Sequence, residues 1–348
     1  NPRSDNPRLA VGGVTPTFET GAGRRVAVDD VDLTVDAGGT VCLVGESGSG
    51  KTVATESITG LVDAPGSTIE GTVRFRGRDL LGLSEPALRS VRGAEIAHVF
   101  QNPQEAMNHC YTVGWQIAEA IQVHESVSNA EARARAVELL DQVGIANASA
   151  RADDYPHAFS GGQKQRVMIA MALAGDPDLL VVDEPTTALD VTVQAQILSL
   201  LASIQERLGT GIVFVTHDLG VVAQIADRVV VLYAGKVMER GDVVDIFEHP
   251  AHPYTRRLLE CVPSIGGSGS GIPGTLPDLR DPPDGCRFAP RCEHAEAACR
   301  AGGQPPEHAV GTSQQASCVH YGSRGDPTVL EPDDDAAWRG EPRGEPEP

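Results

Sequence analysis

The sequence predicts an α/β fold built around a mainly parallel sheet. Three short runs, 41–44, 179–182 and 212–215, are apolar on both faces, as expected of strands buried in the middle of such a sheet. Stretches with helical periodicity follow these runs, and strands that alternate with helices are typical of this fold class. Ligands of open α/β sheets bind outside the carboxyl ends of the strands, so we expect the functional side chains there.

An eight-residue segment after the first of these strands fits the phosphate-cradling pattern G-x-x-x-x-G-K-[ST]. It consists of Gly45, Glu46, Ser47, Gly48, Ser49, Gly50, Lys51 and Thr52. Glycines permit backbone conformations in which successive N–H groups converge on phosphate oxygens. Lys51 would lie beside the β- and γ-phosphates, and the Thr52 hydroxyl would ligate Mg²⁺ at the start of a helix. The segment predicts nucleotide binding; a glycine-rich turn that matches by chance is the alternative.

The composition limits the partners. With 348 residues the chain has room for two or three domains, and its net charge is −20. The acidity is general, because residues 331–348 contribute only seven acids against two arginines. An acidic surface argues against nucleic acid as the main partner. No run approaches the roughly 18–20 apolar residues that cross a bilayer, and residues 1–4 lack the apolar core of a signal peptide, so we expect a cytosolic or peripheral protein.

Two features precede the phosphate-cradling segment. Val31, Leu33 and Val35 alternate with polar residues, which predicts a half-exposed strand. Phe18 lies upstream, at about the distance from which an aromatic ring could stack on an adenine base. An ordinary core position is the equal alternative for Phe18.

A polar amide and a helical segment come next. Gln101 ends the apolar run 96–100 and could reach Mg²⁺ or an attacking water; a solvated loop residue is the alternative. Residues 113–150 are helical in character. Their apolar residues at helical spacing are Ala132, Ala136, Leu139, Leu140 and Val143. We interpret this segment as a helical subdomain inserted into the α/β core.

A second candidate anion site begins another strongly periodic helix. It consists of Ser160, Gly161, Gly162 and Gln163. A hydroxyl and two glycines at a helix start offer N–H groups and the positive end of the helix dipole to an anion. A plain N-cap is the alternative.

The other two buried strands end in chemically active residues. Asp183 and Glu184 follow strand 179–182, where Asp183 is suited to holding Mg²⁺ through water and Glu184 to polarising a water against the γ-phosphate. His217 follows strand 212–215 and could touch the γ-phosphate, with a structural histidine as the alternative. Between these strands we predict a long helix with a core-facing stripe of Val193, Ile197, Leu200, Leu201, Ile204 and Leu208.

The composition changes beyond Gly241, and we place a domain boundary near Asp245. Prolines become frequent, and residues 266–271 form a Gly/Ser linker. Four cysteines then cluster, separated by five, six and eighteen residues: Cys286, Cys292, Cys299 and Cys318. In a reducing cytosol this cluster indicates a metal site rather than disulfides, and four thiolates suit Zn²⁺ or an iron–sulfur cluster.

Together the motifs resemble the ATPase subunits of ABC transporters over about residues 10–245. The resemblance rests on the order of the segments 45–52, Gln101, 160–163, Asp183-Glu184, 188–190 and His217. It implies a RecA-like P-loop ATPase core, residues 1–245, with an inserted helical subdomain at about 102–165. It also implies head-to-tail pairing of two such domains, so that residues 160–163 face the partner's ATP and Asp190 belongs to the D-loop.

The C-terminal part resembles the extension of oligopeptide and dipeptide importer ATPases, which some nickel importers share. The motifs that carry this resemblance are residues 252–256, His-Pro-Tyr-Thr-Arg, and residues 286–292, Cys-Arg-Phe-Ala-Pro-Arg-Cys. Phe159, in place of the usual leucine, fits the same group. His109-Cys110 departs from it, since the family more often has proline and an apolar residue near the groove for the membrane subunit.

This second resemblance implies an extension over residues 246–325 and a [4Fe–4S] cluster on the four cysteines, with Zn²⁺ or free thiols as alternatives. Residues 326–348 are expected to be an acidic, disordered tail. The implied partners are a second, different ATPase subunit, two transmembrane permease subunits and an extracytoplasmic substrate-binding protein. The expected location is the cytoplasmic face of the membrane.

The implied function is ATP hydrolysis, with Glu184, His217 and Lys51 as catalytic residues and Mg²⁺ at Thr52, Gln101 and Asp183, to drive peptide uptake. A nickel importer of the same group is the first alternative. An exporter would share the ATP chemistry but is disfavoured by the extension. A soluble ABC-type ATPase that acts on DNA or ribosomes is disfavoured by the single motif set and the acidic surface.

Overall fold

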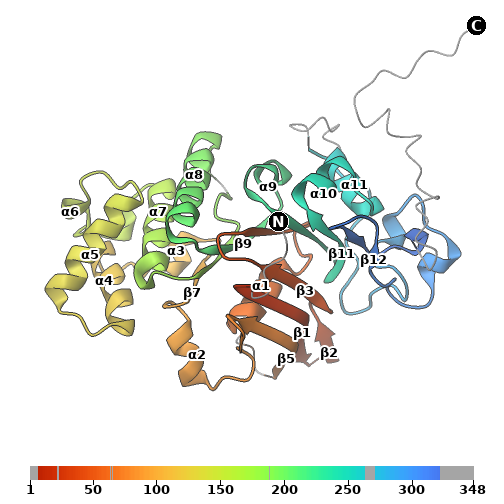
Figure 1. Ribbon diagram of the computed structural model, residues 1–348, viewed down its shortest axis with the longest axis horizontal. Coiled ribbons are helices and arrows are strands. Elements are labelled where there is room, and N and C mark those ends of the chain that lie inside the picture. Colours follow the sequence, from red (N-terminus) through yellow and green to blue (C-terminus); the bar gives the residue numbers. More distant parts are fainter. Residues whose placement is uncertain are drawn as a thin grey trace, which may run out of the picture.

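The computed structural model describes residues 7–21, 23–62, 64, 66–187, 189–262 and 271–321 (Figure 1). Residues 266–270 of the predicted linker, Ala188 before the D-loop aspartate, and the predicted tail 326–348 lie outside the described residues.

The strands are β1 (Leu9–Thr20), β2 (Gly23–Val26), β3 (Val31–Val35), β4 (Thr40–Val44), β5 (Ser67–Phe75), β6 (Arg78–Asp79), β7 (Ile96–Val99), β8 (Leu179–Asp183), β9 (Gly211–Thr216), β10 (Arg228–Tyr233), β11 (Lys236–Asp242), β12 (His308–Ala309) and β13 (Gln315–Ala316). The α-helices are α1 (Lys51–Thr59), α2 (Glu85–Val91), α3 (Pro103–Ala106), α4 (Val113–His124), α5 (Asn129–Gln142), α6 (Ala148–Arg151), α7 (Gly161–Ala172), α8 (Val191–Leu208), α9 (Leu219–Ile225), α10 (Val243–Glu248) and α11 (Pro253–Glu260). Short 3₁₀ turns join them, among them η4 (Ala289–Arg291).

The main sheet has the strand order β12-β13-β11-β10-β4-β9-β8-β7. Strands β10, β4, β9, β8 and β7 are mutually parallel, which confirms the predicted fold class. Val44 pairs with Thr216, and Asp183 pairs with Val215. The parallel register therefore ends β4, β8 and β9 at one edge of the sheet, where the candidate site residues follow.

A second, antiparallel sheet has the order β2-β1-β5-β6, with β3 paired to β1. It lies below the main sheet in Figure 1. Val31, Leu33 and Val35 are buried in β3, and Asp32 and Thr34 between them are more exposed, as predicted. The space between the two sheets is filled by apolar side chains of both and by Ala54 and Ile58 of α1.

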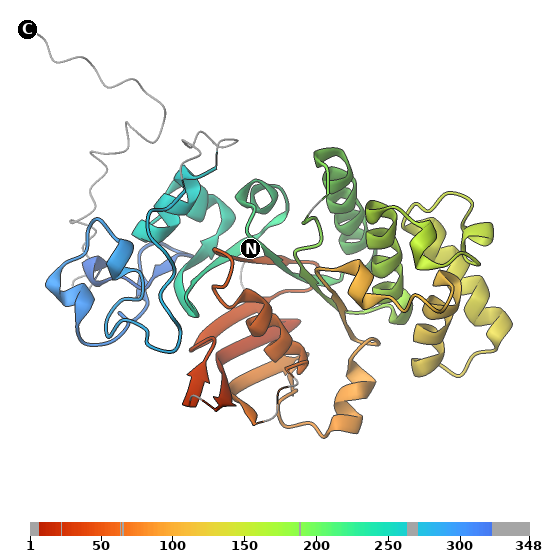
Figure 2. The ribbon, with the colours of Figure 1, turned by 180° about the vertical axis from the view of Figure 1, so that it is seen from behind.

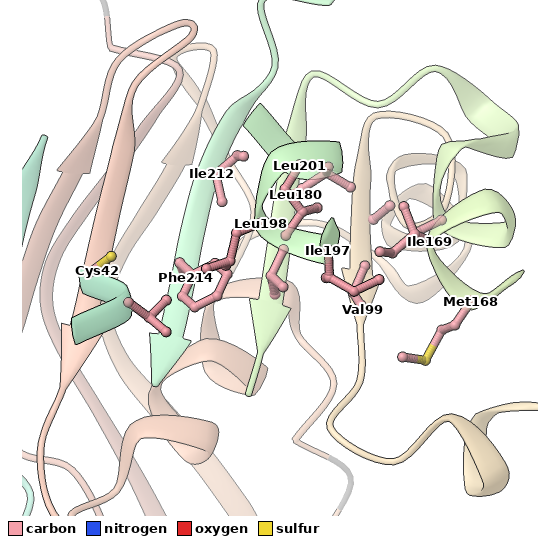
Figure 3. Close-up of a cluster of buried hydrophobic side chains, with 14 of the residues drawn as sticks. Cys42, Val99, Met168, Ile169, Leu180, Ile197, Leu198, Leu201, Ile212 and Phe214 are labelled. Atoms are coloured by element: carbon pink, nitrogen blue, oxygen red, sulfur yellow. The ribbon is translucent and has the colours of Figure 1, made fainter. Parts of the chain in front are cut away.

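Helices α7 and α8 cover the other face of the main sheet. Figure 3 shows Ile197, Leu198 and Leu201 of α8 beside Leu180, Ile212 and Phe214 of the central strands. Met168 and Ile169 of α7 belong to the same core. The predicted stripe of α8 is confirmed at Ile197, Leu201 and Ile204, and Val193 and Leu200 pack against the core while partly buried. It is wrong at Leu208, which is 41% exposed because it is the last residue of the helix, directly before the C-cap Gly209.

The predicted helical segment forms α4, α5 and α6, which lie together at one end of the molecule (Figures 1 and 2). Their shared core contains the five predicted residues, all buried. Helix α7 joins this group to the sheet, since Val167, Ile169 and Ala170 belong to the same core as the strands. The bounds 102–165 for the subdomain remain a prediction.

The C-terminal extension continues the main sheet. Strand β13 pairs with β11 through Glu239 opposite Ala316 and Arg240 opposite Gln315. The fully buried Glu239 carboxylate accepts hydrogen bonds from the backbone N–H groups of Ala251 and His252, each at 2.8 Å, and from Gln314 Nε2 at 2.6 Å. The boundary near Asp245 remains a prediction. It falls within α10, just after β11, which pairs with β10 on one side and with β13 of the extension on the other.

Within the described residues, no helix combines the length and apolar character needed to cross a membrane.

Candidate nucleotide-binding site

The loop between β4 and α1 has a backbone that requires glycine. Gly45, Gly48 and Gly50 have φ angles of 154°, 82° and 101°. A Cβ atom at Gly45 would lie 2.1 Å from the carbonyl oxygen of Leu232. The loop therefore passes over the end of β10 at a distance that only glycine permits, and α1 begins directly at Lys51.

Lys51 is buried, and its ammonium group is held inside the loop. Its Nζ donates to the backbone oxygens of Gly45 at 2.9 Å and Glu46 at 3.1 Å, and lies 3.8 Å from Glu184 Oε1. Burial lowers the pKa of Lys51, while the charges of Glu184, Asp183 and Glu46 act in the opposite direction. These carboxylates favour the charged form of Lys51, which an incoming phosphate needs.

Asp183 and Thr52 meet beside the loop. Asp183 ends β8, is buried, and accepts a hydrogen bond from the Thr52 hydroxyl; burial raises the pKa of this carboxyl. Asp183 Oδ1 and Ser49 Oγ of the loop are buried, and neither has a hydrogen-bond partner among the described residues. A buried oxygen without a partner costs free energy unless a ligand satisfies it. The Asp183 carboxylate and the Thr52 hydroxyl fit a hydrated Mg²⁺ ion, and the Ser49 hydroxyl can donate to a phosphate oxygen.

Glu184 is the centre of a hydrogen-bond network at the edge of the sheet. Its Oε2 accepts from Gln101 Nε2 at 3.0 Å and from the Thr187 hydroxyl at 3.1 Å. Its Oε1 lies 3.2 Å from His217 Nδ1 and 3.8 Å from Lys51 Nζ. The backbone of Glu184 has φ 41°, in the left-handed region that costs a non-glycine residue free energy. The structure thus brings together four predicted residues that lie far apart in the sequence.

The second anion segment, residues 160–163, caps a helix, and among the described residues it forms no hydrogen bond or ion pair with the phosphate loop, residues 45–52, of the same chain. Ser160 caps α7: its hydroxyl accepts from Gln163 N at 3.4 Å, and Gln163 Oε1 accepts from Ser160 N at 3.0 Å. The plain N-cap is therefore present. A role toward a partner's nucleotide remains a prediction.

Asp190 and Phe18 have structural environments that leave their predicted roles open. Asp190 caps α8 by accepting from Val193 N at 2.9 Å. Phe18 lies on β1 opposite Arg25 and Ser67 and is partly buried against the core between the sheets. Its stacking on adenine remains a prediction.

The four clustered cysteines line one small pocket of about 10 Å³, which Phe288 and His252 also line. All four thiols are free. Burial raises the pKa of Cys292 to about 11 and of Cys318 to about 12, and also raises that of Cys286. Among the described His, Cys, Asp and Glu side chains, no group of three or more is arranged to hold a metal ion.

Sequence reasoning missed three residues at the site. Thr187 bonds to Glu184, and its signal was a hydroxyl three residues after the glutamate in a proline-containing turn. Tyr254 and Arg291 of the extension contact Glu46 in the phosphate loop. Both occur in motifs that the sequence analysis used, but nothing in the sequence pairs them with a loop more than 200 residues away.

In P-loop nucleotide hydrolases, a glycine-rich loop and an acidic pair follow parallel strands at one edge of the sheet, as they do here. The added helical subdomain is typical of the ATPase cassettes within this class. Residues 28–187 match the family model described as "ABC transporter". Residues 238–299 match the model described as "Oligopeptide/dipeptide transporter, C-terminal region".

Curated relatives agree with both matches. The "Putative peptide import ATP-binding protein" of Brucella melitensis biotype 1 is 47% identical over 333 residues, which are 91% of this chain and 98% of the relative. A protein of the same name from Brucella abortus strain 2308 is 48% identical over 84% of this chain and 89% of the relative. The chain therefore belongs to the ABC transporter ATP-binding proteins of the oligopeptide/dipeptide group.

Solved structures show the same cassette. The dimeric ATP-binding cassette MJ0796 bound to ADP and Pi has a TM-score of 0.61 and 30% identity, covering 68% of this chain and 98% of its own. The protein cbiO1 from Clostridium perfringens, part of the ABC transporter complex cbiONQ, has a TM-score of 0.60 and 26% identity, covering 70% of this chain and 92% of its own.

Proposed function

We propose that this ABC ATPase energises the uptake of oligopeptides or dipeptides across the cytoplasmic membrane, bound to the membrane's cytoplasmic face. The observation that carries the ATPase chemistry is the convergence of Lys51, Glu184 and His217 at one edge of the sheet. The peptide substrate is supported by the match of residues 238–299 and by the names of the Brucella relatives.

Each residue of the edge has a proposed role in hydrolysis. Lys51 would neutralise the charge that develops on the transferred phosphoryl group. Thr52, Asp183 and Gln101 would hold Mg²⁺, which neutralises phosphate charge when bound. Glu184 would orient the attacking water or accept its proton, and His217 would fix the γ-phosphate. Because Glu184 is already bonded to Gln101, Thr187 and His217, we expect nucleotide binding to rearrange these contacts.

We propose that catalysis needs a second ATPase subunit. Residues 160–163, at the start of α7, are exposed or partly exposed, and within the described part of the chain they form no hydrogen bond or ion pair with its own phosphate loop. They would close on the partner's ATP, as the dimeric state of the similar MJ0796 cassette supports. An isolated chain should bind nucleotide but turn it over slowly. The subfamily resemblance favours a different chain as the partner.

The permease subunits would dock near the start of the helical subdomain. Tyr111 and Trp115 stack with ring centroids 4.1 Å apart, and they are 44% and 43% exposed. The exposed His109 and Cys110 adjoin them, where the sequence departs from its family. Exposed aromatic side chains are enriched where proteins contact each other, so this pair would meet a membrane subunit.

We further propose a metal centre on Cys286, Cys292, Cys299 and Cys318, with a [4Fe–4S] cluster ahead of Zn²⁺ or free thiols. The support is that one pocket collects all four thiols. A pocket of about 10 Å³ is of the size that holds one water, so a cluster would require its walls to move apart. Protein purified without oxygen should contain iron and absorb visible light. Zinc in place of iron would support the alternative. The absence of both metals would refute the metal centre.

Co-purification from membranes tests the importer. We expect two permease subunits and a second ATPase to co-purify with the chain. Vesicles that contain this complex should take up peptide when ATP and a peptide-binding protein are supplied. Uptake of nickel in place of peptide would favour the alternative importer. Recovery with ribosomes or DNA, without any membrane subunit, would refute the proposal.

A further inference from the structure

The peptide unit between Gly45 and Glu46 is held at both of its polar ends. The Glu46 N–H donates to the Tyr254 hydroxyl at 3.0 Å. The Gly45 carbonyl at the other end of the same unit accepts from Lys51 Nζ at 2.9 Å. A tyrosine of the C-terminal extension thus fixes the orientation of the peptide that fixes the lysine.

The Glu46 side chain is held by the same extension. Arg291 Nη1 donates to Glu46 Oε2 at 2.6 Å, and Arg291 Nη2 donates to Glu46 Oε1 at 3.1 Å. Two parallel hydrogen bonds between a guanidinium and a carboxylate combine strength with a defined direction. The Glu46 backbone oxygen also accepts from Lys51 Nζ and from Ser49 N, each at 3.1 Å. Movement of Glu46 would therefore move the contacts of Lys51.

Arg291 is itself rigidly placed. Its side chain is only 4% exposed, and it also donates to the backbone oxygens of Ile272 and Pro273 at 2.9 and 2.8 Å. The Tyr233 hydroxyl lies 3.3 Å from Nη1. Tyr254 is fully buried, with its ring 4.7 Å from that of Tyr233. Both contacts to Glu46 thus come from side chains that are held in place. A flexible ion pair on the surface would contribute little to the stability of the loop.

A second arginine of the same segment contacts residues next to the phosphate loop. Arg287 donates to the Ala234 carbonyl oxygen and lies 3.2 Å from Asp29. The next residue, Gly235, donates its N–H to the Ser49 carbonyl oxygen at 2.8 Å. The segment 286–292 therefore contacts the surroundings of the phosphate loop at two points.

We propose that Arg291 and Tyr254 are positioning residues for the phosphate loop, which hold Glu46, and through it Lys51, in the arrangement that binds MgATP. The C-terminal extension is then part of the ATP site's construction. This inference rests on the proposed ATP-binding role of residues 45–52.

Charge gives the proposal a second consequence. Glu46 places a carboxylate in a loop that must receive a triphosphate, and like charges at short range oppose binding. Arg291 compensates that carboxylate. Removing Arg291 would both free the loop and leave Glu46 uncompensated, whereas removing both charges would relieve the repulsion.

The test measures binding of the non-hydrolysable analogue adenylyl imidodiphosphate with Mg²⁺ to the full chain by isothermal titration calorimetry. Arg291→Ala should weaken binding about tenfold, the loss of roughly one charge-assisted hydrogen bond. Tyr254→Phe should weaken it less, since one neutral hydrogen bond is removed. The double variant Glu46→Gln/Arg291→Ala should bind more tightly than Arg291→Ala alone. Thermal unfolding of each variant monitors the fold.

Arg280→Ala is the matched control and should bind nucleotide as the parent does. This exposed arginine belongs to the same extension, and its only hydrogen-bond partner among the described residues is Asp278. Parental affinity in both Arg291→Ala and Tyr254→Phe would overturn the inference. Weak binding by Arg291→Ala that the Glu46→Gln change does not improve would also overturn it, since damage to the extension's fold predicts no rescue. Failure of the parent and Arg280→Ala to bind would instead refute the proposed ATP site.

Discussion

Replacement of Glu184 by glutamine separates ATP binding from hydrolysis. Glutamine has nearly the same shape, and its amide can keep hydrogen bonds to Thr187 and His217, so the turn at the end of β8 should persist. The change removes a negative charge that lies 3.8 Å from Lys51 Nζ. In the parent protein, this charge favours the charged form of Lys51. The lysine is still held by the carbonyl groups of Gly45 and Glu46, so nucleotide affinity should stay close to that of the parent.

The expected loss is in turnover. A positioned general base contributes about 10²- to 10⁴-fold, so kcat of Glu184→Gln should fall by that factor. The assay is phosphate release by the chain together with its partner ATPase, over a series of protein concentrations, with analogue binding measured in parallel. Glu206→Gln, an exposed change on α8, serves as the control and should keep the parental rate.

Hydrolysis by Glu184→Gln at the parental rate would refute its role as the catalytic base. Equal losses of binding and turnover would place Glu184 among the nucleotide-holding groups instead.

Three further predictions concern stability and pairing. Burial lowers the pKa of His98 to about 4, so on acidification the histidine is protonated in the unfolded chain before it is protonated in the folded one. Between pH 6.5 and 4 the parent should therefore lose up to about 3 kcal/mol of unfolding free energy. His98→Phe should not show this loss in urea unfolding. Ser160→Asp keeps an N-cap acceptor, so the free energy of unfolding should change by less than about 1 kcal/mol. The added negative charge should abolish the ATPase activity of the assembled pair. Full activity would exclude contact between this position and the partner's phosphates. Glu239→Ala leaves buried donors unpaired and should cost about 3 kcal/mol in urea unfolding; a loss below about 1 kcal/mol would mean that Glu239 does not fix the extension.

Local signals in the sequence were enough to predict the parallel sheet and the meeting of Lys51, Glu184 and His217. Each of these residues follows a strand that is apolar on both faces, and parallel strands end at a common edge. The order of the strands in the sheet was not predicted, because it depends on pairings between distant segments. Prediction was weaker at the end of a helix, as at Leu208, because periodicity does not show how far the buried face of a helix extends.

The contacts of the extension with the phosphate loop could not be predicted from the sequence. Arg291 and Glu46 are 245 residues apart and lie on irregular segments without periodicity. A single arginine–glutamate pair has many candidate partners in an acidic chain, and only the folded arrangement selects one. The pocket of four cysteines is an intermediate case, because their spacing indicated proximity but did not define the arrangement of the thiols.

The pairing of β13 with β11 has a consequence for how this protein can be divided. Without β13, the backbone groups of β11 on that side would form an open sheet edge, to which other extended chains readily add. Truncation near Asp245 would also remove the donors Ala251, His252 and Gln314 from the buried Glu239 carboxylate. A shortened cassette should therefore be prone to aggregation, and exchange of the extension between relatives should succeed only if β11 is exchanged with it.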